Sequence, residues 1–363
     1  MGAIGQGLRR SPILGLLIFV PLTILGERIW PEKHTLLFLF SVLAVVPLAA
    51  LLSHATESVA ARTGDAIGGL LNATLGNLTE LVIALTALQA GQYLLVKASI
   101  AGAIVTNTLF MLGGSFLIGG LRHHEQRFNQ ASARMQASLL FLATVALLMP
   151  ALVAGAEGRS AMLQPLSLGL ALLLISAYGL SMLFSLKTHK AVFAAAGPEE
   201  AHAPGEHWPL RPALIVLAVV TVLVALVSEV FVASVQQASD VLGLSPAFVG
   251  FVLVALVGSA AEVATAFSAA AKDRLDLSVG IALGSAAQIA LFVAPLLVLL
   301  SYVIGPAPMS LEFWPGAIAM MLLATLAATM LTSGGRSAWF VGVMILMVYA
   351  IFAMTLFMLP PKP

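Results

Sequence analysis

Eleven apolar runs, each long enough to cross a lipid bilayer, constrain the fold of this chain more than any other feature. A helical crossing needs about 20 predominantly apolar residues. Backbone groups inside a bilayer must bond within their own segment, so such runs fold as helices and exclude an open sheet. The expected limits of the runs are 12–30, 35–61, 66–90, 93–121, 134–154, 160–186, 212–238, 244–271, 275–304, 309–332 and 337–359. The sequence therefore predicts an all-α polytopic membrane protein with eleven transmembrane helices.

Composition excludes several classes of function. The chain has no cysteine, which rules out disulfides, thiolate metal sites and thiol nucleophiles. Its formal net charge of +1 lacks the basic excess that a nucleic-acid partner requires. The N-terminus, Met1 to Ser11, is short and has no small-residue cleavage site before the first apolar run. We interpret that run as a retained helix and not as a signal peptide.

One long polar connection, 188–211, divides the chain. It is rich in proline and glycine and contains Glu199, Glu200 and Glu206, which favours a flexible tether over an acidic cation sensor. The expected organisation is an N-terminal segment and first span (1–34), a first repeat (35–187), a cytoplasmic linker (188–211) and a second repeat (212–363).

Basic residues predict the orientation. With the N-terminus in the cytoplasm, twelve of the seventeen lysines and arginines fall in inner loops. This bias follows the positive-inside rule and places the linker in the cytoplasm and the C-terminus on the opposite side. The short termini suit a bacterial inner membrane.

Four glutamates lie more than three residues from either end of an expected apolar run: Glu57, Glu80, Glu229 and Glu262. An ionisable side chain at the bilayer centre costs roughly 2.5–3.5 kcal/mol on insertion scales, and such residues are functional by default. The glutamates occur as one pair in each half of the chain, which indicates a repeated element with a proton or cation site.

The two halves share a pattern around these glutamates. Residues 68–80 and 250–262 align without a gap, with five of thirteen positions identical. The flanking correspondences are Thr56-Glu57 with Ser228-Glu229, and the glycine-rich stretches 102–107 and 284–288. Each copy contains five expected crossings, an odd number, so the second copy must be inserted upside down relative to the first. We therefore expect two inverted five-helix repeats, an arrangement typical of secondary transporters with a site at the repeat interface.

The spacing within the repeat suggests a cation site formed by Glu80 and Glu262. Each glutamate follows a glycine by four residues, so the glycine lets a neighbouring helix approach or lets the helix break and expose carbonyls. Asn77 and Ser259 precede the glutamates by three residues and add neutral oxygens, as Thr79 does. Such a set could supply the six to eight oxygens that Ca²⁺ takes. Without a cation, burial and mutual repulsion would favour protonation, so protons and cation would compete.

For other polar residues in the spans, the sequence leaves open whether they serve ion transport or helix packing. Glu57 and Glu229 are expected to act as gates or proton relays, with helix packing as the alternative. His54 lies three residues before Glu57 and could pair with it. Asn107 and Gln288 could point at the ion or could form an interhelical hydrogen bond.

Several of these stretches resemble the signatures of CAX-type cation/proton exchangers. The first signature is similar to residues 68–85, from Gly68 to Leu85, and the second is similar to 257–262 with 280–293. Residues 185–190 resemble the stretch that ends the family's sixth span. The resemblance implies an eleven-span fold in the Ca²⁺/cation antiporter superfamily, Ca²⁺/H⁺ exchange, and cation-site glutamates at Glu80 and Glu262. The family commonly has asparagine at the position of Ser259 and histidine at that of Val263, so this chain departs there.

The sequence thus favours a secondary antiporter that exchanges cytosolic Ca²⁺ for H⁺ by alternating access. The alternative is a Na⁺ or K⁺/H⁺ antiporter, or a Na⁺/Ca²⁺ exchanger, of the same fold. An intramembrane hydrolase would need an aspartate pair, a serine with a base or a His–Glu–His set, and a channel would need no paired titratable site. We therefore expect a transporter and not an enzyme, with no bound cofactor. The partners would be the transported ions and the lipid bilayer, and a homo-oligomer is compatible with the sequence.

Overall fold

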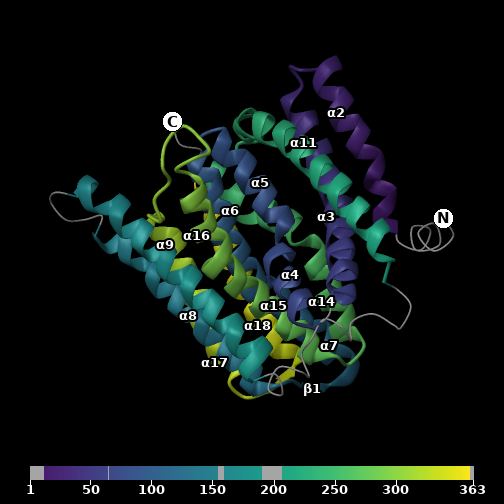
Figure 1. Cartoon of the computed structure of the whole chain (residues 1–363), viewed down its shortest axis with the longest axis vertical. Coiled ribbons are helices and arrows are strands. Elements are labelled where there is room, and N and C mark those ends of the chain that lie inside the picture. The colour runs from purple at the N-terminus through teal and green to yellow at the C-terminus, as the bar shows by residue number, and fades with distance from the viewer. Residues whose placement is uncertain (1–11, 64, 154–158, 190–206, 360–363) are drawn as a thin grey trace.

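Helices form almost all of the regular structure in this computed structural model, which describes residues 12–63, 65–153, 159–189 and 207–359. Figure 1 shows them as one bundle in which helices from both ends of the sequence intermingle. The label η marks 3-10 or π-helical segments. The elements of the first half are η1 (Pro12–Ile18), α2 (Phe19–Ile29), α3 (His34–Arg62), α4 (Asp65–Leu75), α5 (Leu78–Gln89), α6 (Tyr93–Val105), η2 (Thr106–Met111), α7 (Leu112–His123), β1 (Glu125–Arg127), α8 (Gln130–Val153), α9 (Arg159–Leu183) and η3 (Phe184–Thr188).

The second half follows the linker and has a similar series of elements. They are α11 (Leu210–Leu242), α12 (Pro246–Phe248), η6 (Val249–Val254), α13 (Ala255–Gly258), α14 (Ala260–Ala271), α15 (Leu275–Gln288), η7 (Ile289–Val293), α16 (Ala294–Leu300), α17 (Pro315–Thr332), β2 (Arg336–Ala338) and α18 (Trp339–Met358). The acidic residues of the linker, Glu199, Glu200 and Glu206, lie outside the described residues, as does the N-terminal segment 1–11.

Long apolar helices account for most of the expected spans. Among the described residues, eight helices are long and apolar enough to cross a bilayer, and a ninth span results if the bent pair Pro246–Gly258 and Ala260–Ala271 is counted as one. The other two expected spans take different forms. The first, 12–30, begins as the 3-10 segment η1, and the third, 66–90, is divided into α4 and α5. Each therefore contains no continuous α-helix of the length that a straight crossing needs.

The expected tenth span, 309–332, begins later in the structure, because α17 starts only at Pro315. Residues 301–314 form an irregular segment, whose prolines cannot donate a backbone hydrogen bond to a helix. This segment lies over the turn between α5 and α6. There the Tyr93 hydroxyl donates to the carbonyl of Ala307 at 2.7 Å and accepts from its N–H at 2.8 Å.

Two breaks interrupt the helices that carry the paired glutamates. α4 and α5 are separated at Gly76 and Asn77, and α13 and α14 are separated at Ser259 with a bend of 59°. Glycine favours such a break because it exposes its backbone and gains little from the helix. Of the two roles considered for the glycine before each glutamate, the structure shows an interrupted helix at both positions and, at Gly258, also a close approach of the Glu80 side chain from α5.

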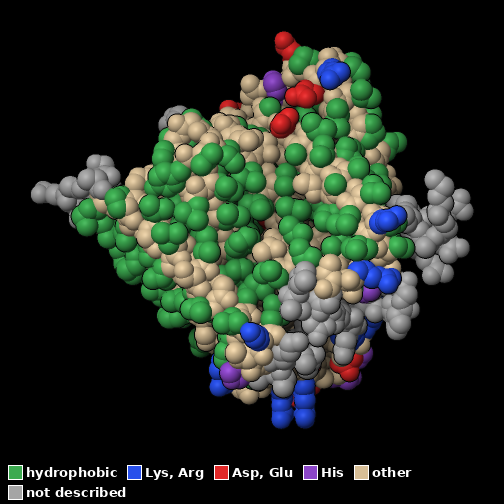
Figure 2. Space-filling view, viewed as in Figure 1, with side chains coloured by type: hydrophobic (Ala, Val, Ile, Leu, Met, Phe, Trp, Pro, Cys, Tyr) green, Lys and Arg blue, Asp and Glu red, His purple; other side chains and the backbone are tan. Residues whose placement is uncertain are grey.

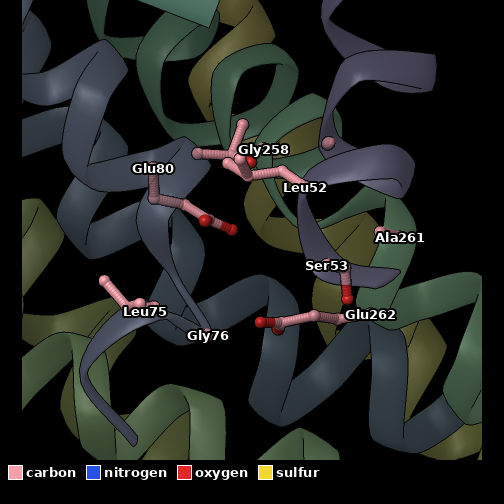
Figure 3. Close-up of a pocket in the computed structure, with 10 residues that line it drawn as sticks. Leu52, Ser53, Leu75, Gly76, Glu80, Gly258, Ala261 and Glu262 are labelled. Atoms are coloured by element: carbon pink, nitrogen blue, oxygen red, sulfur yellow. The ribbon is translucent and has the colours of Figure 1, made fainter. Parts of the chain in front are cut away.

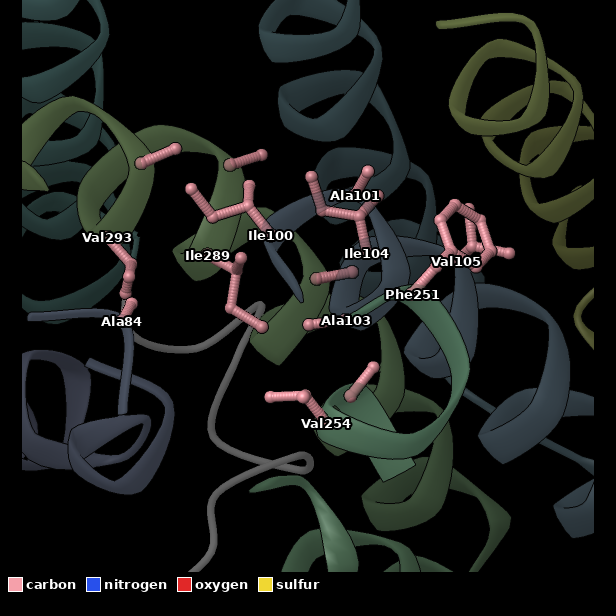
Figure 4. Close-up of a cluster of buried hydrophobic side chains, with 14 of the residues drawn as sticks. Ala84, Ile100, Ala101, Ala103, Ile104, Val105, Phe251, Val254, Ile289 and Val293 are labelled. Carbon is pink, nitrogen blue, oxygen red and sulfur yellow. The ribbon is translucent and has the colours of Figure 1, made fainter. Parts of the chain in front are cut away.

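The centre of the bundle is a close contact between elements of the two halves. Figure 4 shows small and branched side chains of α6 against Phe251 and Val254 of η6 and Ile289 of η7. A Cβ built on Gly102 would lie 2.1 Å from the carbonyl oxygen of Phe251, so only glycine allows these backbones to meet. Without a hydrophobic driving force between helices in lipid, such close packing is a main source of association.

A short antiparallel sheet connects the two halves at the end of the bundle where α7 finishes. β1 pairs with β2, with Gln126 opposite Ser337. The Gln126 amide also donates to the Asp273 carboxylate at 2.8 Å and to the Ala270 carbonyl at 3.1 Å. The loop after α7 is thereby attached to the turn between α14 and α15.

The outer surface of the bundle suits a lipid environment. In Figure 2, hydrophobic side chains cover the body of the molecule, and most visible charged side chains lie toward its upper and lower ends. Leu172 and Leu173 of α9 are 53% and 52% exposed, as expected for residues that contact lipid tails. The chain is thus an all-helical membrane protein in its composition, helix lengths and surface.

Candidate cation site

Glu80 and Glu262 come from different halves of the chain and face one small cavity (Figure 3). The cavity has a volume of about 10 Å³, which is room for about one water molecule. The residues that line it are Ala49, Leu52, Ser53, Leu75, Gly76, Thr79, Glu80, Gly258, Ala261 and Glu262. Helix α3 closes the side of the cavity between the two broken helices. The structure therefore brings the two expected site glutamates together.

Close packing brings both carboxylates to the cavity and leaves one oxygen of each without a donor, while the Glu262 side chain is in hydrogen-bond contact with Ser285. A Cβ built on Gly258 would lie 3.0 Å from Cγ of Glu80, so the Glu80 side chain runs directly over this glycine. Oε1 of Glu80 and Oε2 of Glu262 are both buried and have no hydrogen-bond partner among the described residues. A buried carboxylate oxygen without a partner is costly, so each oxygen favours a proton or a cation.

Helix breaks place both glutamates at a positive helix end. Glu80 lies in the first turn of α5, and Glu262 lies in the first turn of α14. The N-terminus of a helix carries a partial positive charge that stabilises a nearby carboxylate by roughly 0.3–1 kcal/mol, and by up to about 2 kcal/mol when partly buried. The two half-helices thus offset part of the cost of burying negative charge, as discontinuous helices do in transporter sites.

A chain of neutral side chains extends from the first helix break into the second half. Asn77 Nδ2 donates to Gln288 Oε1 at 2.6 Å, and Asn77 Oδ1 accepts from the Ser285 hydroxyl at 2.7 Å. Ser285 in turn accepts from Asn107 Nδ2 at 3.0 Å. Of the two readings kept for Asn107 and Gln288, the structure thus contains interhelical hydrogen bonds. Sequence reasoning missed Ser285, because the equivalent residue of the first half is the apolar Ala103.

The two remaining expected ligands, Thr79 and Ser259, differ in whether they line the cavity. Thr79 is 5% exposed and lines the cavity. Ser259 is fully buried, but its hydroxyl donates to the Ala255 carbonyl of its own helix at 2.5 Å, and the residue does not line the cavity. The second half therefore has no counterpart to the crossing amide of Asn77.

A second, larger cavity adjoins the first along α3. It has a volume of about 180 Å³, and its lining includes Glu57, His54 and Thr265 as well as Ser53 and Ala261, which also line the small cavity. Ser53 Oγ donates to Glu57 Oε1 at 3.1 Å. The His54 ring lies edge-on against a linker residue, Trp208, with 4.5 Å between ring centroids. Glu57 and His54 thus line a cavity that adjoins the one faced by Glu262.

Glu229 occupies a different environment from Glu57, its counterpart in the repeat. It is exposed on α11, one turn from Leu226 and two from Val222, which are 41% and 59% exposed. This face of α11 is apolar, and Glu229 lines neither of the two cavities. The two halves are therefore not equivalent in this conformation.

The chemistry of the site is that of two carboxylates with neutral helpers. Within the described ranges, no group of three or more histidine, aspartate or glutamate residues could hold a metal ion. A cation between Glu80 and Glu262 would therefore need hydroxyl, amide or carbonyl oxygens to complete its shell. Hard cations such as Ca²⁺ accept all of these ligands. The arrangement can hold protons or such a cation.

Comparisons with known proteins identify the family of this chain. The family model described as "Sodium/calcium exchanger protein" matches residues 33–187 and again residues 212–358. The chain is 40% identical to the Ca(2+)/H(+) antiporter of Aphanothece halophytica, over 98% of each chain. It is 38% identical to the Ca(2+)/H(+) antiporter ChaA of Bacillus subtilis, over 94% of this chain and 97% of the relative. The solved structure of native YfkE matches with a TM-score of 0.84 and 34% identity, and the match covers 96% of this chain and all of YfkE. The chain therefore belongs to the sodium/calcium exchanger protein family.

Proposed function

We propose that this chain exchanges cytosolic Ca²⁺ for protons across a bacterial inner membrane, with Glu80 and Glu262 binding the two ions in turn. The observation that carries the proposal is a pair of unpartnered carboxylate oxygens, from equivalent positions of the two halves, at a single cavity. Relatives of 38% and 40% identity that are named Ca(2+)/H(+) antiporters support the choice of ions.

Competition at one site couples the two fluxes. With no cation present, two buried carboxylates repel each other and favour protonation. A divalent cation that displaces the protons satisfies both charges and the unpartnered oxygens at once. The cavity of about 10 Å³ is too small for a hydrated ion, so Ca²⁺ would enter with most of its water replaced by protein oxygens. Thr79 would supply one of these oxygens, and the amides of Asn77, Asn107 and Gln288 are further candidates.

The larger cavity supports an access route from one side. It runs along α3 toward Arg62, the end that the basic residues assign to the cytoplasm. We infer that this conformation is open toward the cytoplasm and that Glu57 relays ions between that opening and Glu262. By the symmetry of the repeats, Glu229 would take the same role on the opposite side.

The inverted-repeat arrangement belongs to this proposal. The match of one family model to each half of the chain supports it, and so does the equivalent placement of Glu80 and Glu262 after helix breaks. Sliding of the flanking helices, α3 and α11, would then expose the cavity to one side at a time.

A second candidate is exchange of another ion pair by the same site. Ser259 provides no amide to the cavity, and the family description includes sodium/calcium exchange. Uptake of Ca²⁺ into proteoliposomes under an imposed pH gradient, compared with an imposed Na⁺ gradient, separates the two. Uptake driven by Na⁺ alone would favour the second candidate.

The central test is neutralisation of each glutamate. Glu80→Gln and Glu262→Gln should each abolish Ca²⁺ uptake driven by a pH gradient, because an amide cannot exchange a proton for a cation. Glu125→Gln is the matched control, since Glu125 is 56% exposed in an ion pair with Arg336 and lies on β1. Size-exclusion profiles would verify folding. Normal uptake by either cavity variant would refute the role of that residue.

A further inference from the structure

Four neutral side chains near the cavity form a hydrogen-bond chain with one direction. Asn77 donates to Gln288, Ser285 donates to Asn77, and Asn107 donates to Ser285. Each link is between 2.6 and 3.0 Å long, and Asn77, Ser285 and Asn107 are at most 6% exposed. This hydrogen-bond chain joins η2 to α15 through Asn77, at the break between α4 and α5. Its Gln288 end lies against Gly76, a residue that lines the cavity: a Cβ built on Gly76 would lie 3.4 Å from Gln288 Oε1 and 3.7 Å from Nε2.

The two ends of this chain carry its two unsatisfied polar atoms. Nε2 of Gln288 and Oδ1 of Asn107 are buried without a hydrogen-bond partner among the described residues. A chain in which every link points the same way must end in this manner, with a free donor at one end and a free acceptor at the other. Every group between the ends is satisfied.

Such a chain can also run in the opposite direction without moving any backbone. An amide exchanges its oxygen and nitrogen positions by rotating half a turn, and a serine hydroxyl can both donate and accept. After reversal, Gln288 would donate to Asn77, Asn77 to Ser285, and Ser285 to Asn107. The free group near the cavity would then be the Gln288 oxygen instead of its NH₂.

We propose that Gln288, Asn77, Ser285 and Asn107 form a reversible hydrogen-bond switch that is set by the ion in the cavity, with Ser285 as its pivot. The observed direction presents a donor toward the carbonyl oxygen of a protonated carboxyl group, and the reversed direction presents an acceptor to a bound cation. Ser285 is a positioning residue for the amides, and its hydroxyl is also in hydrogen-bond contact with the Glu262 side chain. The inference rests on the proposed function of Glu80 and Glu262, and it adds that an amide dipole reverses when the cation replaces protons.

The switch exists on only one side of the site. In the second half, the residue equivalent to Asn77 is Ser259, whose hydroxyl is engaged with Ala255 of its own helix. In the first half, Ala103 occupies the position equivalent to Ser285 and cannot donate. The hydrogen-bond switch therefore acts from one side on a cation site whose two carboxylates occupy equivalent positions in the two halves.

Ser285→Ala tests the pivot, with Ser278→Ala as the matched control. Ser278 is on the same helix two turns earlier and is also fully buried, but it is not part of the chain. Without Ser285, each direction leaves one amide N–H and one amide carbonyl unsatisfied. The unsatisfied N–H belongs to Asn107 in the observed direction but to Asn77, next to the cavity-lining Gly76, in the reversed direction, where a bound cation repels it, so the cation-bound state loses more. The KM for Ca²⁺ should rise roughly two- to tenfold in Ser285→Ala, a change that matches the net free energy of one hydrogen bond. The kcat should change little. Ser278→Ala should retain the normal KM.

A double-mutant cycle between the ends of the chain tests reversal itself. Asn107 and Gln288 bond to different partners, so independent roles would make the effects of Asn107→Leu and Gln288→Met on KM multiply. A shared switch predicts that Asn107→Leu adds almost nothing once Gln288 is methionine. Multiplying effects, or a normal KM in Ser285→Ala, would overturn the switch, and Asn107→Leu alone serves if Ser285→Ala does not fold. Loss of transport in Glu80→Gln alongside these outcomes would leave the proposed function intact.

Discussion

Gly258→Ala is the substitution whose effect on the site can be worked out most directly. The new methyl carbon would lie 3.0 Å from Cγ of Glu80 and 3.4 Å from its Cδ and Oε1. The contact with Cγ is thus 3.4 − 3.0 = 0.4 Å shorter than the lower edge of ordinary van der Waals contact. Cγ lies close to the helix and not at the far end of the side chain. Relief therefore requires a shift of the whole Glu80 carboxylate away from Gly258.

The cost of this crowding can be estimated from overpacked interiors. Inserting a methyl group into a well-packed region costs typically about 1–3 kcal/mol. If the cation-bound state bears the cost, because it needs both carboxylates in place, the affinity for Ca²⁺ falls by roughly five- to 150-fold. The cavity of about 10 Å³ offers little room into which Glu80 could move without such a loss.

Initial rates of Ca²⁺ uptake in proteoliposomes, measured against Ca²⁺ concentration at one imposed pH gradient, give the KM. Gly284→Ala is the control, because a Cβ there would meet only Gln136, at an ordinary 3.6 Å. We expect a raised KM in Gly258→Ala and a nearly normal KM in Gly284→Ala, with thermal unfolding checked for both. A normal KM in Gly258→Ala would show that the Glu80 carboxylate need not occupy this position to bind the cation.

Three other predictions follow from the surroundings of the site. Glu57→Gln should slow Ca²⁺ loading from the side of the larger cavity, whereas Glu229→Gln should not, since Glu229 lies outside that cavity; equal effects in an assay with one-sided Ca²⁺ addition would count against the route. Ser259→Asn should raise the preference for Ca²⁺ over Na⁺ in a selectivity panel, because it supplies the amide that the second half lacks, and unchanged selectivity would exclude position 259 as a ligand position. Trp208→Ala should lower the unfolding temperature, since removing a buried tryptophan costs about 3–5 kcal/mol; the Trp208 side chain is buried against the His54 ring, and an unchanged unfolding temperature would mean that this side chain contributes no stability.

Repetition in the sequence was enough to select the two central acids. A glutamate is rare in an apolar run, and its recurrence after a glycine in both halves identified Glu80 and Glu262 without knowledge of their distance. In the structure, both residues line one cavity. The same reasoning could not find Ser285, since a serine among small residues is common and its importance comes from Asn77 and Asn107, which are distant in sequence.

Symmetry in the sequence also concealed differences between the halves. Glu57 and Glu229 are equivalent in the alignment, yet Glu57 lines the larger cavity and Glu229 lines neither of the two described cavities. Likewise, Ser259 donates within its own helix, while Asn77 crosses to the other half. A transporter in one conformation must break the symmetry of its repeats, because one side is open while the other is closed.

Hydrophobicity along the chain determined that it crosses a membrane many times, because the cost of exposing or burying each run depends on its composition alone. Tertiary structure decided where the helices break, since the ends of α5 and α14 are stabilised by the carboxylates and neighbours that they meet. It likewise decided which polar groups are paired, because a hydrogen bond between α4–α5 and α15 depends on packing that local sequence does not encode.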